Sequence, residues 1–171
     1  DPGKEGYTAI IQPDGTVQTL AIPTVGTEYD LQEIVRMVRG WSTLCCCHAT
    51  LEQQQPAYRP GGTPLNMANS MVKASFHLGA GYMLWKMALA MVGIPCDTVL
   101  PRVWKKRMGI LVGAEVADAK KRAKVSKERA VTACQQLFPG VDLRRSERGR
   151  VPCPDKAEAI LLARYGFLHG R

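Results

Sequence analysis

Alternation of apolar and polar residues near the beginning of the chain predicts a β-hairpin. Tyr7–Ile11 is an apolar run, and Thr16–Ile22 mixes polar with apolar residues in the manner of a strand. The residues between the two segments include Pro13, Asp14 and Gly15, which are typical of a tight turn. We therefore expect two antiparallel strands joined by this turn.

The next segments alternate between helical and strand-like patterns. Residues 29–41 carry apolar side chains at helical spacing and predict an amphipathic helix. Leu44–Leu51 is a short apolar run that we interpret as a buried strand, with Glu52 at its end. The stretch 57–65 is rich in proline and glycine and is expected to be a loop.

The middle of the chain predicts further helices around one more strand. Met67–Val92 is expected to form one long helix or two, and its methionines, among them Met87 and Met91, to pack in the core rather than against a cofactor. The remaining predictions are a strand at Cys96–Leu100, a short basic helix at Pro101–Met108 with proline at its first position, a long basic helix at Asp118–Leu137 and a polar connection at Val141–Val151.

The last predicted helix, Asp155–Tyr165, follows two prolines and is expected to stop at Gly166. Glu158 is the only polar residue in Ala157–Ala163, so this helix should be buried. Asp155 and Glu158 lie three residues apart and therefore on one face. Two interpretations are open: the pair is a cap at the start of the helix, or it binds a cation.

The order of elements indicates an α/β chain with a mixed sheet, and 171 residues are consistent with a single domain, 1–171. The net charge is +8, and the excess is local, because residues 102–150 contain 14 Lys and Arg against 5 Asp and Glu. Such a basic segment favours a polyanionic partner, nucleic acid before membrane, although a solvated basic surface is the alternative. No apolar run reaches the ~18 residues of a membrane span, so no membrane partner is expected.

The six cysteines contain no Cys-x-x-Cys pair, which favours reduced, buried thiols over a disulfide framework or a zinc site. Acidic residues occur instead at three places: Asp1 before the first strand, Glu52 after a buried strand, and the pair Asp155 and Glu158. If these places converge, they offer oxygen ligands suited to Mg²⁺ or Mn²⁺. Two such ions can catalyse phosphodiester cleavage.

Several stretches, in this order, make the chain resemble the RuvC-type Holliday-junction resolvases of the ribonuclease H-like superfamily, and most closely their organellar branch, the monokaryotic-chloroplast resolvases. The stretches cover most of the chain: Asp1-Pro2-Gly3-x-x-Gly6, Glu52-Gln53, Ser75-Phe76-x-x-Gly79-x-Gly81-Tyr82-x-x-Trp85, Val99-x-Pro101-x-x-Trp104-Lys105-Lys106, Ser126-Lys127-Glu128-Arg129-Ala130 to Leu137-Phe138-Pro139, Asp155-x-Ala157-Glu158-Ala159, and Ala163-x-Tyr165-Gly166.

The resemblance implies a ribonuclease H-like fold, a mixed β-sheet flanked by helices. It implies that Asp1, Glu52, Asp155 and Glu158 are the catalytic, metal-binding carboxylates, holding two Mg²⁺ ions for which Mn²⁺ can substitute. It further implies a Mg²⁺-dependent endodeoxyribonuclease that acts as a homodimer and makes paired symmetric nicks in four-way junction DNA. Family members usually carry an apolar strand before the first aspartate, so we expect residues to precede Asp1 in the active protein.

The resemblance also assigns a surface to the DNA, with the region around Gly79 and Gly81 facing the junction core. The expected DNA-binding residues are Lys73, Ser75, Gly79, Gly81, Tyr82, Lys105, Lys106 and Lys127. Tyr82 could stack on a base or pack within its helix, and each lysine could contact a phosphate or be solvated. The implied location is the chloroplast, in association with the nucleoid, reached by a transit peptide that this chain does not carry.

Two other functions are open at this point. The chain could be another ribonuclease H-like nuclease that cuts RNA–DNA hybrids or flaps, or a non-catalytic protein that binds junctions. Four carboxylates argue against a pure binding protein, because acidic clusters repel phosphates.

Overall fold

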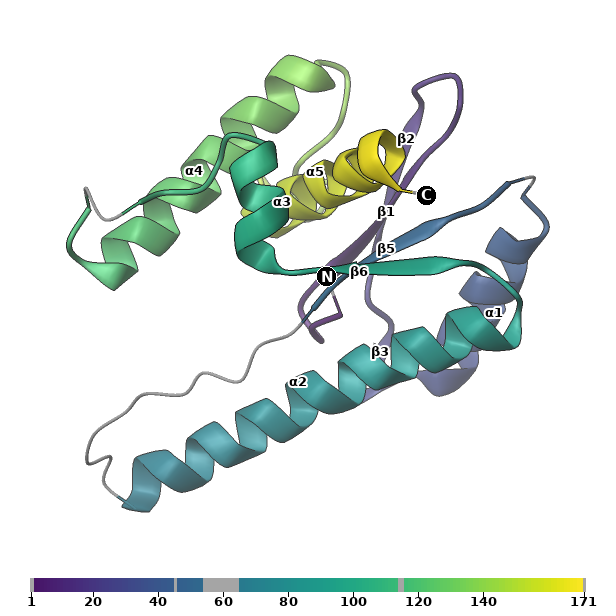
Figure 1. Ribbon diagram of the computed structural model, residues 1–171, viewed down its shortest axis with the longest axis horizontal. Helices are drawn as coiled ribbons and strands as arrows, with labels where there is room; N and C mark the ends of the chain where they lie inside the picture. Colours follow the sequence, from purple (N-terminus) through teal and green to yellow (C-terminus); the bar gives the residue numbers. More distant parts are fainter. Residues whose placement is uncertain (1, 45, 54–64, 114–115, 171) are drawn as a thin grey trace.

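The computed structural model describes residues 2–44, 46–53, 65–113 and 116–170, with the backbone alone for 65–75. Within these residues the chain is α/β, with five helices and three two-stranded ladders (Figure 1). The elements are β1 (Tyr7–Ile11), β2 (Val17–Ala21), β3 (Thr24–Val25), β4 (Glu28–Tyr29), α1 (Leu31–Ser42), β5 (Ala49–Glu52), α2 (Leu65–Met91), β6 (Cys96–Val99), α3 (Pro101–Arg107), α4 (Ala119–Leu137) and α5 (Pro154–His169).

The predicted hairpin is confirmed. β1 and β2 pair antiparallel, with Tyr7 opposite Ala21 and Ile11 opposite Val17. In the turn, the Asp14 carboxylate accepts a hydrogen bond of 2.8 Å from the Thr16 N–H. Gly15 adopts a φ of +86°, which a glycine reaches without steric cost. The turn residues therefore set the register of the hairpin.

The strand predicted at Leu44–Leu51 is only partly correct. β5 begins at Ala49, and Cys46 before it has a φ of +59°, which is incompatible with a continuous strand. The loop predicted at 57–65 lies almost entirely outside the described residues. β5 pairs in parallel with β6, with Glu52 opposite Val99. Because α3 follows β6 directly, this pairing places the start of α3 beside the end of β5 where Glu52 lies.

Within the described residues, the three ladders are not hydrogen-bonded into the single mixed sheet that we expected. An apolar cavity of about 590 Å³ is lined by residues of both β1 and β5. Its lining includes every residue of β1, and consecutive residues of a strand point to opposite faces, so the cavity runs along the strand edge. α5 closes it on one side, and Trp41, Trp85 and Leu89 also line it.

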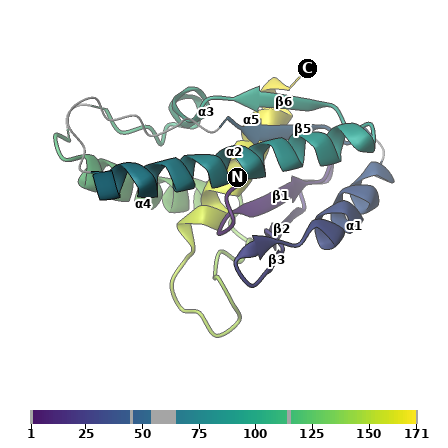
Figure 2. The same cartoon turned by 90° about the horizontal axis from the view of Figure 1, so that it is seen from below.

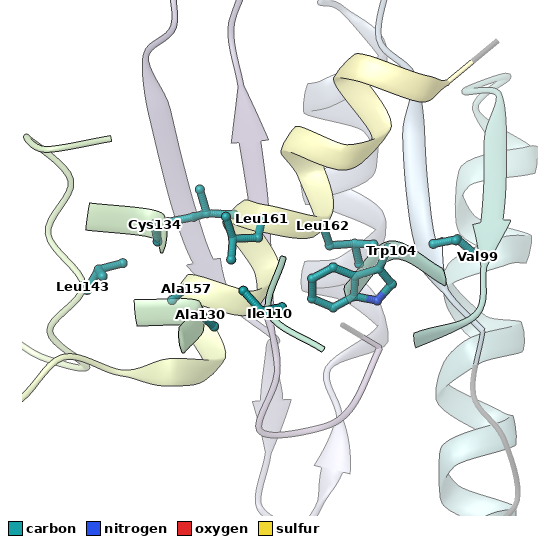
Figure 3. Packing of buried hydrophobic residues seen from close by; sticks show 10 residues of the cluster. Val99, Trp104, Ile110, Ala130, Cys134, Leu143, Ala157, Leu161 and Leu162 are labelled. Carbon is teal, nitrogen blue, oxygen red and sulfur yellow. The ribbon is translucent and has the colours of Figure 1, made fainter. Parts of the chain in front are cut away.

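Two large apolar cores and a small third one, formed by Tyr7, Cys153 and Ala159, hold the described elements together. Figure 3 shows the first, in which α5 packs against α4 and the end of α3, with Trp104, Ile160 and Leu161 at most 1% exposed. The second joins α1, α2 and β5 through residues such as Ile34, Val38 and Trp85. α2 lies on the outside of the molecule along this second core (Figures 1 and 2).

Two predictions about the helices need correction, and one open alternative is decided. α5 does not stop at Gly166 but continues to His169, because this glycine lets the helix pack tightly against Thr50, whose side chain a Cβ at position 166 would strike. The alternative of one long helix for Met67–Val92 is correct, because α2 runs from Leu65 to Met91. Its methionines with described side chains are not core residues, since Met83 is 51%, Met87 59% and Met91 77% exposed.

The expectation of buried thiols holds for Cys134 and Cys153 alone among the described cysteines. Cys46 is exposed, and Cys47 and Cys96 are half-buried. Cys47, Cys96, Cys134 and Cys153 are free thiols.

Candidate functional site

Glu52 lies at the carboxyl end of β5 and is held by an indole. The Trp104 Nε1–H donates a hydrogen bond of 2.7 Å to Glu52 Oε2. Trp104 is only 1% exposed, because its ring fills the core beneath α3. A donor fixed by core packing orients the carboxylate it binds, so the side chain of Glu52 is held in place by the fold rather than by solvent.

Glu158 is bound by the next residue of α3. Lys105 Nζ lies 2.7 Å from Glu158 Oε1, and the two side chains are only 20% and 16% exposed. Consecutive residues of α3, Trp104 and Lys105, thus bind Glu52 and Glu158. The carboxylates of β5 and α5 are therefore brought to the same short helix, although they are 106 positions apart in the sequence.

Asp155 opens α5 and faces two cations. Its Oδ1 lies 3.0 Å from Lys127 Nζ, and its Oδ2 lies 3.7 Å from the Arg145 guanidinium. The capping interpretation is wrong, because the N-cap residue is Cys153 and no side chain caps the helix. Asp155 still lies in the first turn, where the helix dipole favours a negative charge.

Lys127 lies beside the charges of both carboxylates of α5. The hydrogen bond with Asp155 raises the pKa of the Lys127 ammonium above its ordinary value. The negative charges of Asp155 and Glu158 raise it further, whereas partial burial lowers it. Lys127 therefore keeps its positive charge throughout the neutral range. Lys106, in the last turn of α3, is exposed.

The donors at this place are carboxylate oxygens, which suit Mg²⁺ or Mn²⁺ rather than zinc. Among the described residues, no group of three or more Asp, Glu, His or Cys side chains is arranged to hold a metal ion. Asp1, the expected fourth carboxylate, lies outside the described residues. Its neighbour Pro2 is buried, and the Pro2 carbonyl accepts a 2.9 Å hydrogen bond from Tyr29. The carboxylate oxygens of Glu52, Asp155 and Glu158 are the kind of ligand that a hard cation prefers. In the structure, Lys105 pairs with Glu158 and Lys127 pairs with Asp155.

The region of α2 that the sequence assigned to DNA is divided in two by the structure. Gly79 is exposed with open space around it. Gly81 is buried, and a Cβ there would meet the Tyr29 hydroxyl and lie 2.7 Å from the Pro2 carbonyl. The absence of a side chain at Gly81 thus has a packing reason. The side chains of the expected DNA-binding residues Lys73 and Ser75 lie outside the described part of the chain.

The aromatic residues of this region have different surroundings. Tyr82 is half-buried, with the Lys86 ammonium 5.5 Å from its ring centre. Trp85 is 4% exposed and stacks on Trp41 with ring centres 6.0 Å apart. Its buried indole N–H has no hydrogen-bond partner within the described residues. Trp85 is therefore a packing residue.

Two features of the candidate site were not predicted from the sequence: the role of Arg145 and the partner of Glu52. No role was assigned to Arg145, although two consecutive arginines shortly before an acidic helix start are a signal for an ion pair. The bond between Trp104 and Glu52 was also missed, because nothing in the local sequence shows that residues 52 positions apart meet.

The sequence matches no family model and no curated protein. Within the described residues, every helix is too short or too polar to cross a membrane.

Proposed function

We propose that this protein is a Mg²⁺-dependent, structure-selective DNA endonuclease of the ribonuclease H-like type that nicks four-way junctions. The observation that carries the proposal is that α3 binds carboxylates from two distant segments, Glu52 of β5 and Glu158 of α5, while Asp155 opens α5. Glu52 and Glu158 bind neighbouring residues of α3, and Asp155 lies one turn from Glu158. These are three of the four carboxylates that the resemblance assigns to catalysis.

The cations around the carboxylates support a phosphate-containing substrate. Lys105, Lys127 and Arg145 reach them from α3, α4 and the loop before α5, in the segment that holds the excess positive charge. In the structure these cations neutralise the carboxylates. A metal ion would compete for the same oxygens, and the lysines would then be available to a DNA phosphate, with which they interact as point charges.

The metal chemistry follows from the donor set. Two Mg²⁺ ions held by Asp1, Glu52, Asp155 and Glu158 would activate a water molecule and stabilise the leaving oxygen. Trp104 would orient Glu52, and the Lys127 ammonium, which lies beside Asp155, would be placed to contact a phosphate. The ordered stretches that resemble organellar resolvases support the junction as substrate, a homodimer that makes paired nicks, and a chloroplast nucleoid location.

The test compares cleavage of a four-way junction, an RNA–DNA hybrid and a flap by one preparation with and without Mg²⁺. We expect symmetric nicking of the junction alone. Glu52→Gln and Asp155→Asn should lower the cleavage rate at least ~10³-fold while junction binding persists. Glu128→Gln is the matched control, because Glu128 is an exposed acid of α4 that pairs only weakly with Lys124 at 3.9 Å, and it should cut like the wild type.

If Glu52→Gln or Asp155→Asn cut junctions at the wild-type rate, these carboxylates would not be catalytic and the proposed site would be wrong. Preferred cutting of the hybrid or flap would assign the protein to another branch of ribonuclease H-like nucleases.

One observation favours a second candidate, a non-catalytic junction-binding protein: Asp155 and Glu158 already have cationic partners. Such a protein would bind junctions with a steep salt dependence and would show no cleavage with Mg²⁺ or Mn²⁺. Calorimetric titration with Mg²⁺ distinguishes the two candidates. The nuclease should bind Mg²⁺, and Asp155→Asn should weaken that binding, whereas the non-catalytic protein does not require Mg²⁺ binding.

A further inference from the structure

Trp104 of α3 is the largest fully buried side chain of the first core. It is 1% exposed and lies among residues of β6, α4 and α5, such as Val99 and Leu162 (Figure 3). A buried indole still carries one N–H donor, and leaving that donor without an acceptor destabilises the fold. The packing of the ring therefore determines where this donor lies and which acceptor it can reach.

The Trp104 ring contacts charged groups in two ways. Its Nε1–H donates the 2.7 Å hydrogen bond to Glu52 Oε2. The Lys105 ammonium lies 5.2 Å from the ring centre, over the face of the indole, where a cation is attracted. The same ammonium pairs with Glu158 at 2.7 Å. One rigid ring thus binds the carboxylate of β5 directly and supports the cation that binds the carboxylate of α5.

Trp85 shows that burial of a tryptophan in this protein does not by itself provide a partner for the indole. Trp85 is 4% exposed, and its N–H has no hydrogen-bond partner within the described residues. Among those same residues, the Trp104 N–H is the only hydrogen-bond donor to the Glu52 carboxylate. The orientation of Glu52 therefore depends on this single donor.

The bond from Trp104 differs in kind from the ion pairs of the other two carboxylates. Lys105 and Lys127 neutralise Glu158 and Asp155, so a divalent cation must compete with them. The indole N–H is a neutral donor, and an ionised carboxylate has about four acceptor positions on its two oxygens. Glu52 can therefore keep its bond to Trp104 while it accepts a cation.

We infer that Trp104 is a positioning residue of the metal site, which strengthens Mg²⁺ binding by holding Glu52 in one orientation in the metal-free protein. A side chain that is already held loses less conformational freedom on binding. Hydrogen bonds to metal-binding side chains typically account for about 10- to 100-fold in metal affinity. The inference rests on the proposed function, since it takes Glu52 as a ligand of Mg²⁺, and Trp104 acts through Glu52 rather than as a ligand.

The experiment compares two tryptophan-to-phenylalanine variants by calorimetric titration with Mg²⁺. Trp104→Phe keeps an aromatic ring in the core beside Lys105 but removes the donor to Glu52. Trp85→Phe is the matched control, because it makes the same substitution at a buried indole whose N–H has no partner within the described residues. We expect Trp104→Phe to bind Mg²⁺ about 10- to 100-fold more weakly than the wild type, and Trp85→Phe to bind it within about twofold of the wild type.

A spectroscopic measurement separates positioning from a general loss of packing. Each of the 3 tryptophans gives one indole N–H signal in a ¹H–¹⁵N spectrum, and the signal of Trp104 is the one that disappears in Trp104→Phe. Glu52→Ala should shift this signal in the metal-free protein, and Mg²⁺ should shift it in the wild type, because both changes alter the acceptor. The Trp85 signal should stay in place in both cases. If Trp104→Phe does not fold, Trp41→Phe and Trp85→Phe identify the Trp104 signal by elimination.

Two results would overturn the inference: Mg²⁺ binding by Trp104→Phe that is as tight as that of Trp85→Phe, or Mg²⁺ binding to the wild type without a shift of the Trp104 signal. Either result, with a wild type that binds Mg²⁺ and cuts junctions, leaves the nuclease proposal intact. A wild type that binds no Mg²⁺ overturns the proposed function and, with it, the role of Trp104 in metal binding.

Discussion

α5 and α2 are both long helices with mostly apolar sequences, yet the structure covers them to different extents. Ile160, Leu161 and Leu162 of α5 are at most 3% exposed. On α2, Met83 and Met87 are more than half exposed. α5 was expected to be buried, and it is. The methionines of α2 were expected to pack in the core, and for Met83 and Met87 that expectation is wrong.

The difference comes from the number of neighbours around each helix. α5 is enclosed by β1, β5, α3 and α4, which together surround its axis. α2 contacts α1, β5 and β6, all on its inward side. An apolar helix surface stabilises the fold only where another element removes it from water. The comparison shows that apolar composition predicts what a helix can bury but not how much of it is buried.

The largest expected effect is a core truncation in α5. Leu161→Ala should lower the free energy of unfolding by about 3 kcal/mol, because Leu161 is fully buried and leaves a cavity. Met87→Ala in α2 should change the stability of the monomer by less than about 0.5 kcal/mol. Urea denaturation of both variants at a concentration where the wild type is monomeric measures the contrast, and equal losses would contradict it.

The second prediction concerns Cys134, a buried residue of α4 that belongs to the same apolar core as α5. Burial raises the pKa of the Cys134 thiol from 9.0 to about 11. Between these pH values the unfolded chain releases a proton that the folded chain retains, so stability must fall as pH rises from 9 to 11. The loss attributable to this thiol is at most about 2–3 kcal/mol.

Cys134→Ala removes this titration. Its free energy of unfolding should be lower than that of the wild type at pH 8, and its decline between pH 9 and 11 should be shallower. Denaturation curves at half-unit pH steps give both values, and parallel declines would show that the thiol titrates normally.

The smallest effect compares one glycine in each helix. Gly166→Ala in α5 should destabilise the protein by about 1–3 kcal/mol, because its Cβ would strike the Thr50 side chain. Gly79→Ala in α2 should stabilise it by up to about 1 kcal/mol, since Gly79 has open space around it and alanine favours a helix. Thermal melting of the two variants should shift in opposite directions, and two shifts of the same sign would refute the assigned packing.

Local patterns in the sequence were sufficient for most elements. The hairpin, α1, β6, α3 and α4 were predicted within a few residues, because turn residues, caps and periodicity act over short distances. Asp30, for example, caps α1 by accepting a 3.0 Å hydrogen bond from the Glu33 N–H. β5 was predicted too long because an apolar run of cysteines does not reveal the positive φ of Cys46.

The carboxylates of the candidate site could be selected from the sequence, but their partners could not. An acidic residue after an apolar run drew attention to Glu52, and acidic spacing drew attention to Asp155 and Glu158. Their partners Trp104, Lys105 and Lys127 come from other helices. No local rule pairs them, since each pairing depends on how α3, α4 and α5 pack.

The sequence by itself determined which segments become helices and strands and which helices are apolar, because backbone preferences and side-chain periodicity are local properties. Only the tertiary structure decided that Gly166 continues a helix, that Gly81 accommodates Tyr29, and that one apolar face of α2 remains uncovered. The physical reason is the same in each case. Burial and close approach depend on which segments meet in space, and that meeting is fixed by the packing of the whole chain.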